Sequence, residues 1–413
     1  MNLIKPLSQT LKPLLSMPID KQKLLQRKWP TFHFPLAQEI IDRIPKGEEG
    51  EIKGEPVRVD DYGARVTAKK GFQYEPPPWP EDYLTAYQVS VGRVDAVALP
   101  FEPGECAVKA MVKTSRGVCY GITGGAMSHL FSFDPAAKTV TPQGRLDGMI
   151  RKNGMAPLAD GAVLWAAHLA GGEGWLYVRS EGGSPEKICC PVKGEGIAAL
   201  ASSPDGRQVY GISDRSGVFF VYDSKTRTVA QKGAVDRDGL FSSTLAVDDR
   251  GDVYGGARWT RLFKYDARNG TLAQLETKAP LLAGREMYTR IDALLFDPRS
   301  RSVFGGTSDG MLFQFHPENG KMISLGKILN QPRIRCLTMG GDGCLYGIAG
   351  KDCCHLFRYN PADRDLRDLG MLFVASPRAW NGYEFDAAVT GPQGEVCFGE
   401  NDQISHVFVY SPS

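Results

Sequence analysis

Three of the six histidines occupy the same place in a repeated tetrapeptide. The tetrapeptide reads S-H-L-F at His129, C-H-L-F at His355 and S-H-V-F at His406. Neutral imidazoles suit Mn²⁺ or Zn²⁺, so these side chains are candidate ligands of a divalent metal. A position that recurs in a repeat also suits a structural role, in which each imidazole bonds a neighbouring loop carbonyl. We therefore expect either no cofactor or a divalent metal, and we favour the structural role for this shared position.

Two further features concern acid–base and thiol chemistry. His168 ends the apolar stretch W-A-A-H, in the part of the chain that departs most from the repeat, and it is a candidate general base together with His129. Cys353 and Cys354 precede His355, but no partner lies at the spacing of a metal site, which favours a structural role. The sequence contains no Ser-His-Asp order, phosphate-binding loop, dinucleotide fingerprint or metalloprotease motif. Any active site must therefore be assembled by the fold.

The composition excludes several classes of protein. The 413 residues carry a formal net charge of +2, which gives no support for indiscriminate binding to nucleic acid or to a membrane surface. Nine cysteines without a C-x-x-C spacing indicate neither a disulfide framework nor a zinc knuckle. The N-terminus lacks the uninterrupted apolar stretch of a signal peptide, and no run of about 18 apolar residues occurs. We expect a cytoplasmic protein with no transmembrane segment.

The elements that must position these residues follow from a repeat. Its clearest part is a strand of the form L-F-x-Y-D, in which apolar and polar residues alternate. The seven copies begin at Leu130, Trp175, Phe219, Leu262, Leu312, Leu356 and Val407. Successive copies are about 43 to 51 residues apart, the length of a unit of four strands.

The other strands of the unit lie upstream of this one. A strand with a small-residue end, such as Tyr210-Gly211 or Phe304-Gly305, precedes most copies, and its glycines suit strands that converge on a crowded axis. A short apolar strand, as at 197–201 and 334–338, comes before it and is expected to be innermost. The chain ends just after the third strand of the last unit. Residues 87–94 are therefore predicted to supply its fourth strand and to close a ring without open edges.

This pattern resembles the seven-bladed β-propellers, and its Y-G-G-T and L-F-x-Y-D-P segments are most similar to kelch-like and related propellers. The resemblance covers residues 87–413 and implies an all-β fold. The W-D and G-H signatures of WD40 repeats are absent. Residues 1–86 differ and are predicted to form an extension packed on the propeller. It would contain short helices after Pro18 and over 35–44, and a Pro-rich tether at 74–80.

Propeller topology predicts where a ligand would bind. Loops from the second to the third strand, and from one blade to the next, lie on one rim of the central channel. Arginines gather in these loops and would focus positive potential that suits a carboxylate, sulfate or phosphate. The predicted binding residues are Arg258, Arg290, Arg333, Arg335, Arg378, Trp380 and Asn381. We therefore expect an anionic oligosaccharide or another small anion as the partner, with no nucleic acid and no membrane.

The composition of this rim bears a weak resemblance to propeller-fold polysaccharide and oligosaccharide lyases, which implies β-elimination across a uronate. That reaction needs a cation to neutralise the carboxylate, a base to take the C5 proton and an acid to protonate the leaving O4. The first role is predicted for Arg290, Arg333 or Arg335. The base would be His168 or His129, and the acid Tyr288 or Tyr383.

Two alternatives remain open from the sequence. A non-catalytic propeller that binds a protein or a glycan would satisfy every repeat feature. A lyase of small cyclic esters, similar to the streptogramin-inactivating propellers, would share the fold and differ only in substrate.

Overall fold

The structure, a computed structural model, describes residues 92–169, 171–236, 238–328, 331–351, 354–372 and 380–412, with short strands at 50–51, 66–68, 72–74, 88–89 and 374–375. The chain divides into two compact units, residues 1–59 with 64–77 and residues 60–63 with 78–413. In the first unit, β1 (Gly50–Glu51), β2 (Val66–Ala68) and β3 (Phe72–Tyr74) form a small sheet. The helices predicted after Pro18 and over 35–44, and residues 75–80 of the tether, lie outside the described residues.

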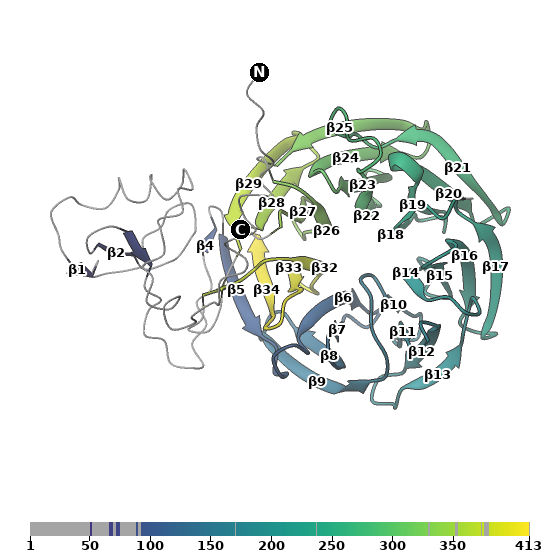
Figure 1. Ribbon diagram of the computed structural model, residues 1–413, viewed down its shortest axis with the longest axis horizontal. Helices are drawn as coiled ribbons and strands as arrows, with labels where there is room; N and C mark the ends of the chain where they lie inside the picture. The colour runs from purple at the N-terminus through teal and green to yellow at the C-terminus, as the bar shows by residue number, and fades with distance from the viewer. Residues whose placement is uncertain are drawn as a thin grey trace, which may run out of the picture. The chain divides into compact units, whose positions relative to one another are not determined.

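The second unit is a seven-bladed β-propeller, as the sequence predicted (Figure 1). Each of its first six blades is an antiparallel sheet of four strands in sequence order. The strands of blades 1 to 3 are β6 (Ala107–Lys113), β7 (Cys119–Gly124), β8 (Ser128–Asp134), β9 (Thr139–Leu146), β10 (Met155–Pro157), β11 (Val163–His168), β12 (Gly174–Arg179), β13 (Glu186–Cys189), β14 (Ile197–Ser202), β15 (Gln208–Ser213), β16 (Val218–Asp223) and β17 (Thr228–Ala234). All seven predicted L-F-x-Y-type strands are the third strands of their blades.

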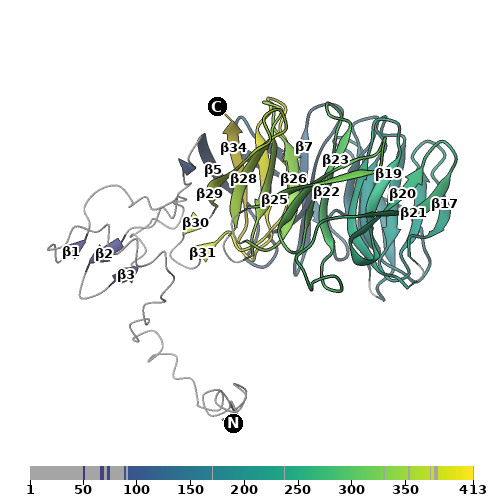
Figure 2. The ribbon, with the colours of Figure 1, turned by 90° about the horizontal axis from the view of Figure 1, so that it is seen from above.

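The strands of blades 4 to 6 are β18 (Phe241–Val247), β19 (Val253–Ala257), β20 (Arg261–Asp266), β21 (Thr271–Lys278), β22 (Ile291–Asp297), β23 (Ser302–Thr307), β24 (Met311–His316), β25 (Lys321–Lys327), β26 (Ile334–Met339), β27 (Leu345–Ala349), β28 (His355–Asn360) and β29 (Asp365–Met371). In Figure 1 the innermost strands β6, β14, β18, β22 and β26 lie around the centre of the ring. Figure 2 shows the blades from the side, with their strands running between the two faces of the ring.

The two ends of the propeller meet in the seventh blade. Its strands are β32 (Phe385–Thr390), β33 (Val396–Glu400), β34 (His406–Pro412) and β5 (Gly92–Ala98), with β4 (Gln88–Val89) at the edge. β34 and β5 pair along their whole length, from His406 opposite Ala98 to Pro412 opposite Gly92. The outer strand of this blade therefore comes from the N-terminal end of the propeller and begins a few residues later than the stretch 87–94.

The hydrophobic core lies between the blades. The described residues form seven buried clusters, each shared by two neighbouring sheets. Phe219 and Phe263, for example, lie in adjacent blades with ring centroids 6.1 Å apart, and both are fully buried. The eight described cysteines are all free thiols. No helix among the described residues is long and apolar enough to cross a membrane.

The repeated glycines of the second strand serve packing purposes. Gly211 pairs directly with Phe220 of the third strand, and a Cβ atom built on Gly211 would lie 2.2 Å from the phenyl ring. The same contact recurs between Gly121 and Phe131 and between Gly305 and Phe313, at 2.1 Å. The first glycine is therefore required by an aromatic ring within its own blade, whereas a Cβ on the second glycine of β23, Gly306, would lie 2.3 Å from Ile334 of the next blade, as expected for strands that converge on a crowded axis.

We expect Gly211→Ala to destabilise the propeller, because the buried Phe220 ring would have to move. Such overpacking costs about 1–3 kcal/mol, measurable as a lower urea midpoint. The control is Gly183→Ala, an exposed site where the nearest atom to an added Cβ is 3.3 Å away. That variant should change the free energy of unfolding by less than about 0.5 kcal/mol. Equal effects of the two substitutions would contradict the packing explanation.

Candidate functional site

The innermost strands share a β-bulge near their first residue. The pairing register shifts between Val108 and Ala110, and equivalent shifts occur in β14, β22, β26 and β32. The residues at these shifts are Lys109, Ala198, Asp292, Arg335 and Asp386. A bulge removes one residue from regular alternation and re-aims its side chain, a device common beside active sites. All but Asp292 line one pocket.

Ion pairs and hydrogen bonds join these residues around the channel. Arg333 Nε lies 3.1 Å from Asp292 Oδ2, and Arg335 Nη1 lies 3.4 Å from Glu384 Oε2. Arg335 also forms an ion pair with Asp386, whose side chain is 2% exposed. The Asn401 side-chain amide donates to Asp386 Oδ2 at 2.7 Å. Together these contacts connect blades 5, 6 and 7.

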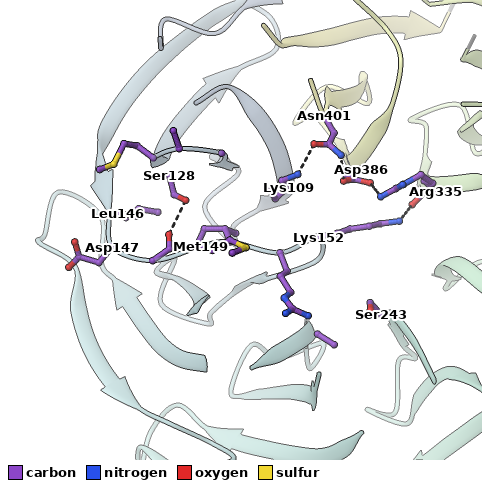
Figure 3. A pocket seen from close by; sticks show the side chains of 17 residues that line it. Lys109, Ser128, Leu146, Asp147, Met149, Lys152, Ser243, Arg335, Asp386 and Asn401 are labelled. Carbon is purple, nitrogen blue, oxygen red and sulfur yellow. Dashed lines mark hydrogen bonds and ion pairs between the residues drawn. The ribbon is translucent and has the colours of Figure 1, made fainter. Parts of the chain in front are cut away.

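Lys109 extends the network into blade 1. Its Nζ donates to the Asn401 side-chain oxygen at 2.6 Å (Figure 3). Burial, followed by the nearby Arg335, lowers the pKa of Lys109 from its ordinary 10.5, although Asp386 opposes this shift. A lysine with a lowered pKa in a polar pocket is suited to proton transfer, because its neutral amine is more populated.

A loop from blade 1 to blade 2 extends side chains into the channel. We call residues 148–154 the strap. Lys152 of the strap donates to the backbone oxygens of Asp292 at 2.9 Å and Arg335 at 2.5 Å, on blades 5 and 6. The Asn153 amide donates to the backbone oxygen of Ser243 at 2.7 Å, on blade 4. Asn153 adopts a φ of 56°, in the left-handed region that asparagine tolerates better than most residues. The strap therefore bonds to blades far from its own.

Lys152 differs from the arginines in its partners. Both of its hydrogen bonds go to uncharged carbonyl groups, and burial lowers its pKa from the ordinary 10.5. Arg151, next to it in the strap, pairs with Asp214 at 2.8 Å and is 46% exposed. Both side chains line the pocket. The pocket thus holds the cations Lys109, Arg151, Lys152 and Arg335, and the carboxylates Asp147 and Asp386.

The pocket has a volume of about 840 Å³, which is large enough for a ligand of two or three rings. Its walls come from the loop between β7 and β8, the strap, and the bulged residues of the innermost strands. Since these loops join second to third strands or one blade to the next, the pocket lies on the rim that topology predicted. We call this the pocket face.

Comparisons with known proteins bear on the architecture. No protein-family model matches the sequence, and no curated protein matches it significantly. Among solved structures, virginiamycin B lyase from Staphylococcus aureus is similar, with a TM-score of 0.59, 9% identity and coverage of 77% of this chain and 99% of that chain. Its catalytically inactive variant with quinupristin gives a TM-score of 0.57 at 9% identity, with the same coverage.

A second kind of protein also matches. The extracellular domain of the putative hybrid two component system BT4673 from B. thetaiotaomicron gives a TM-score of 0.54 at 16% identity, and covers 76% of this chain and 39% of that chain. These likenesses show the propeller fold. They include a lyase and a domain of a two component system, so the fold is shared by proteins of different function.

The structure brings together three of the predicted binding arginines. Arg290, Arg333 and Arg335 surround Asp292 and Glu384, with Arg290 Nε 3.6 Å from Asp292 Oδ1. Only Arg335 lines the pocket, and its buried Nε has no hydrogen-bond partner within the described residues. Of these three arginines, Arg335 is therefore the one placed to contact a ligand in the pocket, through the part of its side chain other than the buried Nε.

Of the other predicted binding residues, only the side chain of Arg258 is described. Arg258 forms an ion pair with Asp238 and stacks on Trp259, with its Cζ 4.2 Å from the ring centroid. It does not line the pocket. Arg378 lies outside the described residues, and Trp380 and Asn381 are described only as strand β31 (Trp380–Asn381), paired with β30 (Val374–Ala375).

None of the four predicted acid–base residues lines the pocket. His168 is buried, its Nε2 lies 2.9 Å from the backbone oxygen of Ile197, and burial lowers its pKa. His129 is buried against Phe101 and contacts Glu105 at 2.8 Å. Tyr288 and Tyr383 are exposed on the pocket face, outside the pocket wall. No described histidine lines the pocket, and the four catalytic assignments stay predictions.

The shared histidine position pairs with carboxylates. His129 contacts Glu105, His355 contacts Asp368 at 3.0 Å, and His406 contacts Glu400 at 2.8 Å. The three imidazoles belong to blades 1, 6 and 7 and have separate partners. In the part of the chain that the structure describes, no three His, Cys, Asp or Glu side chains are grouped as metal ligands would be.

Four residues of the network escaped the sequence analysis as site residues: Lys109, Asp292, Asp386 and Asn401. A signal for the first three was present in the innermost strands, which read V-K-A-M, I-A-A-L, I-D-A-L, I-R-C-L and F-D-A-A. The second letter varies and is often charged, although apolar residues flank it on both sides. A polar residue at that place of a buried strand indicates a bulge or a functional position.

Proposed function

We propose that this protein is a carbon–oxygen lyase that performs β-elimination on an anionic substrate in the channel-mouth pocket, with a uronate-containing saccharide as the substrate class. The observation that carries the proposal is Lys109, a lysine with a lowered pKa whose Nζ lies in a pocket beside Arg335. The fold likeness to a lyase is consistent with this chemistry. Saccharide uronates offer both the carboxylate and the leaving oxygen that the reaction needs.

The substrate carboxylate would bind near Arg335 and Arg151. Arg335 lines the pocket with a side chain that is 16% exposed, and Arg151 is half-exposed at the pocket wall. Neutralising the carboxylate makes the adjacent C5 proton more acidic, because negative charge builds up on the carboxylate during its removal. Lys152 donates hydrogen bonds to two backbone carbonyls and adds positive potential to the pocket. Neither of these two partners is a carboxylate.

Lys109 would then transfer the proton. Its neutral amine takes the proton from C5, the C4–O4 bond breaks as the C4–C5 double bond forms, and the resulting ammonium returns the proton to O4. The step needs no co-reactant and leaves Lys109 neutral. We place this role on Lys109 because His168 and His129 are bonded beside the pocket, outside its wall. General acid–base catalysis of this kind contributes about a hundred- to ten-thousandfold to the rate.

The test is to incubate the full chain with oligogalacturonate, ulvan and glucuronate-containing gum fragments, and to follow ultraviolet absorbance of the unsaturated uronate. We expect absorbance to rise with at least one substrate, and mass spectrometry to show fragments that sum to the mass of the substrate. Absence of product on all three classes would reject the uronate assignment.

A second candidate is a non-catalytic propeller that binds an anion. It is favoured by the absence of every described histidine from the pocket wall and by the ion pairs that already neutralise Arg333 and Arg335. Calorimetry on the same fragments separates the two candidates. Binding without any product supports the second, whereas product formation supports the first.

A further inference from the structure

Large apolar side chains are exposed on one face of the propeller only. Among the described residues of the propeller, every exposed large apolar side chain lies in a loop of the pocket face. These residues are Met127, Met149, Leu240, Trp259, Leu282, Met287, Tyr288 and Tyr383. Exposed apolar groups that gather in this way mark a binding surface, whereas isolated ones need no explanation.

Two of these residues belong to the pocket itself. Met127 lies in the loop between β7 and β8, and Met149 lies in the strap, with 36% and 59% of their surfaces exposed. Together with Leu146 and Ile150 they form one wall, which we call the methionine wall. In Figure 3, Leu146 and Met149 lie on one side of the pocket, while Lys109, Asn401, Asp386 and Arg335 lie on the other.

Hydrogen bonds hold the methionine wall in place. Ser128 Oγ donates to the backbone oxygen of Gly148 at 3.1 Å and so ties the β7–β8 loop to the strap (Figure 3). The backbone of Met149 exchanges two hydrogen bonds of 2.9 Å with the backbone of His168. The backbone that carries the methionine wall is therefore held in place before any ligand binds, so only the methionine side chains remain to be ordered.

We infer that the pocket takes an amphipathic anion, in which a carboxylate is joined to an aromatic or alkyl group. The carboxylate would face Arg335 and Arg151, and the apolar group would lie on Met127 and Met149, whose thioethers make favourable contacts with aromatic rings. This inference rests on the proposed function and narrows its substrate from uronates in general to uronates that bear an apolar substituent.

Three commercial probes separate the two halves of such a ligand. Para-nitrophenyl β-D-glucuronide carries both the carboxylate and the ring, glucuronate carries only the carboxylate, and para-nitrophenyl β-D-glucoside carries only the ring. We expect calorimetry on the full chain to give the tightest binding for the first probe. Its affinity should exceed that of glucuronate by roughly 2- to 10-fold for each methionine that contacts the ring.

Variants then assign the contribution to the wall. Met149→Ser and Met127→Ser should each weaken binding of the nitrophenyl glucuronide by roughly 2- to 10-fold and leave glucuronate unchanged. Met287→Ser is the matched control, since Met287 is an exposed methionine of the same face that does not line the pocket. It should change neither affinity.

The outcomes separate this inference from the proposed function. Equal affinity for the nitrophenyl glucuronide and glucuronate would overturn the amphipathic ligand and leave the pocket as a simple anion site. An effect of Met287→Ser as large as that of Met149→Ser would also overturn it. Failure of all three probes to bind would remove both the inference and the anion-binding step of the proposed function.

Discussion

Replacing Arg335 with methionine is expected to lower the free energy of unfolding by about 3–5 kcal/mol. The guanidinium pairs with Asp386 and Glu384, and its side chain is only 16% exposed. Methionine would leave the Asp386 carboxylate, 2% exposed, without the guanidinium that pairs with it, while the hydrogen bond from the neutral Asn401 amide would remain. Glu384 is less affected, because it is 23% exposed and retains Arg333 at 3.8 Å. Urea unfolding followed by tryptophan fluorescence measures the loss.

A second substitution tests the cause. In the variant Arg335→Met with Asp386→Asn, no uncompensated charge is buried, so more than half of the lost stability should return. Arg301→Met is the surface control, since Arg301 is 46% exposed and pairs with Asp249 at 3.4 Å. Its effect should stay below about 1 kcal/mol. A double variant no more stable than Arg335→Met alone would show that shape, and not charge, causes the loss.

The fold was predictable because each blade repeats the same local pattern. Alternation in a segment such as Leu312 to His316 marks a third strand, and the spacing between copies equals the length of one blade. The strand that completes the last blade was also predictable, because the third strand at Val407 to Tyr410 would otherwise be an unpaired sheet edge. These are local or counting arguments, and they do not depend on side-chain positions.

The site was less predictable because it depends on deviations from the repeat. Alternation alone places Asp292 and Asp386 in the buried interior of a strand, and only the bulges observed in β22 and β32 explain how they pair with arginines. The strap is the loop from blade 1 to blade 2, and nothing in the sequence indicates that its Lys152 reaches blades 5 and 6. Arg335 was among the predicted binding residues because arginines are numerous in the loops of this rim, and its contact with a ligand stays a prediction.

The histidines of the repeated tetrapeptide show how far residue type alone can guide a prediction. Their chemistry attracted attention, yet His355 and His406 each contact a carboxylate of their own blade, and His406 is 1% exposed. Residue type alone cannot distinguish such a satisfied polar contact from a ligand, because both require a polar neighbour. Repetition of the position in three blades was the better guide, since chemistry at one site does not need three copies of the same residue.

Replacing Lys109 is expected to have the largest effect on activity. Lys109→Met should lower kcat/KM by about a hundred- to ten-thousandfold if the amine transfers the proton. Lys232→Met is the matched control, because Lys232 is exposed on β17, and it should retain full activity. Lys109→Arg is more informative. Arginine keeps the positive charge but does not release its proton, so this variant should be as inactive as Lys109→Met.

The pH profile supplies an independent readout of the same residue. The base must be neutral to accept a proton. Because burial lowers the pKa of Lys109 from 10.5, activity should rise with pH as the amine loses its proton. Activity should level off at a pH above the lowered pKa, where the amine is fully deprotonated. The residual activity of Lys109→Met should lack this rise, because the titrating amine is gone. If Lys109 instead acted only as a cation, activity would fall as pH rises through the same pKa, and Lys109→Arg would be active. Either result would contradict the assignment of Lys109 as the base and leave it as an anion-binding residue.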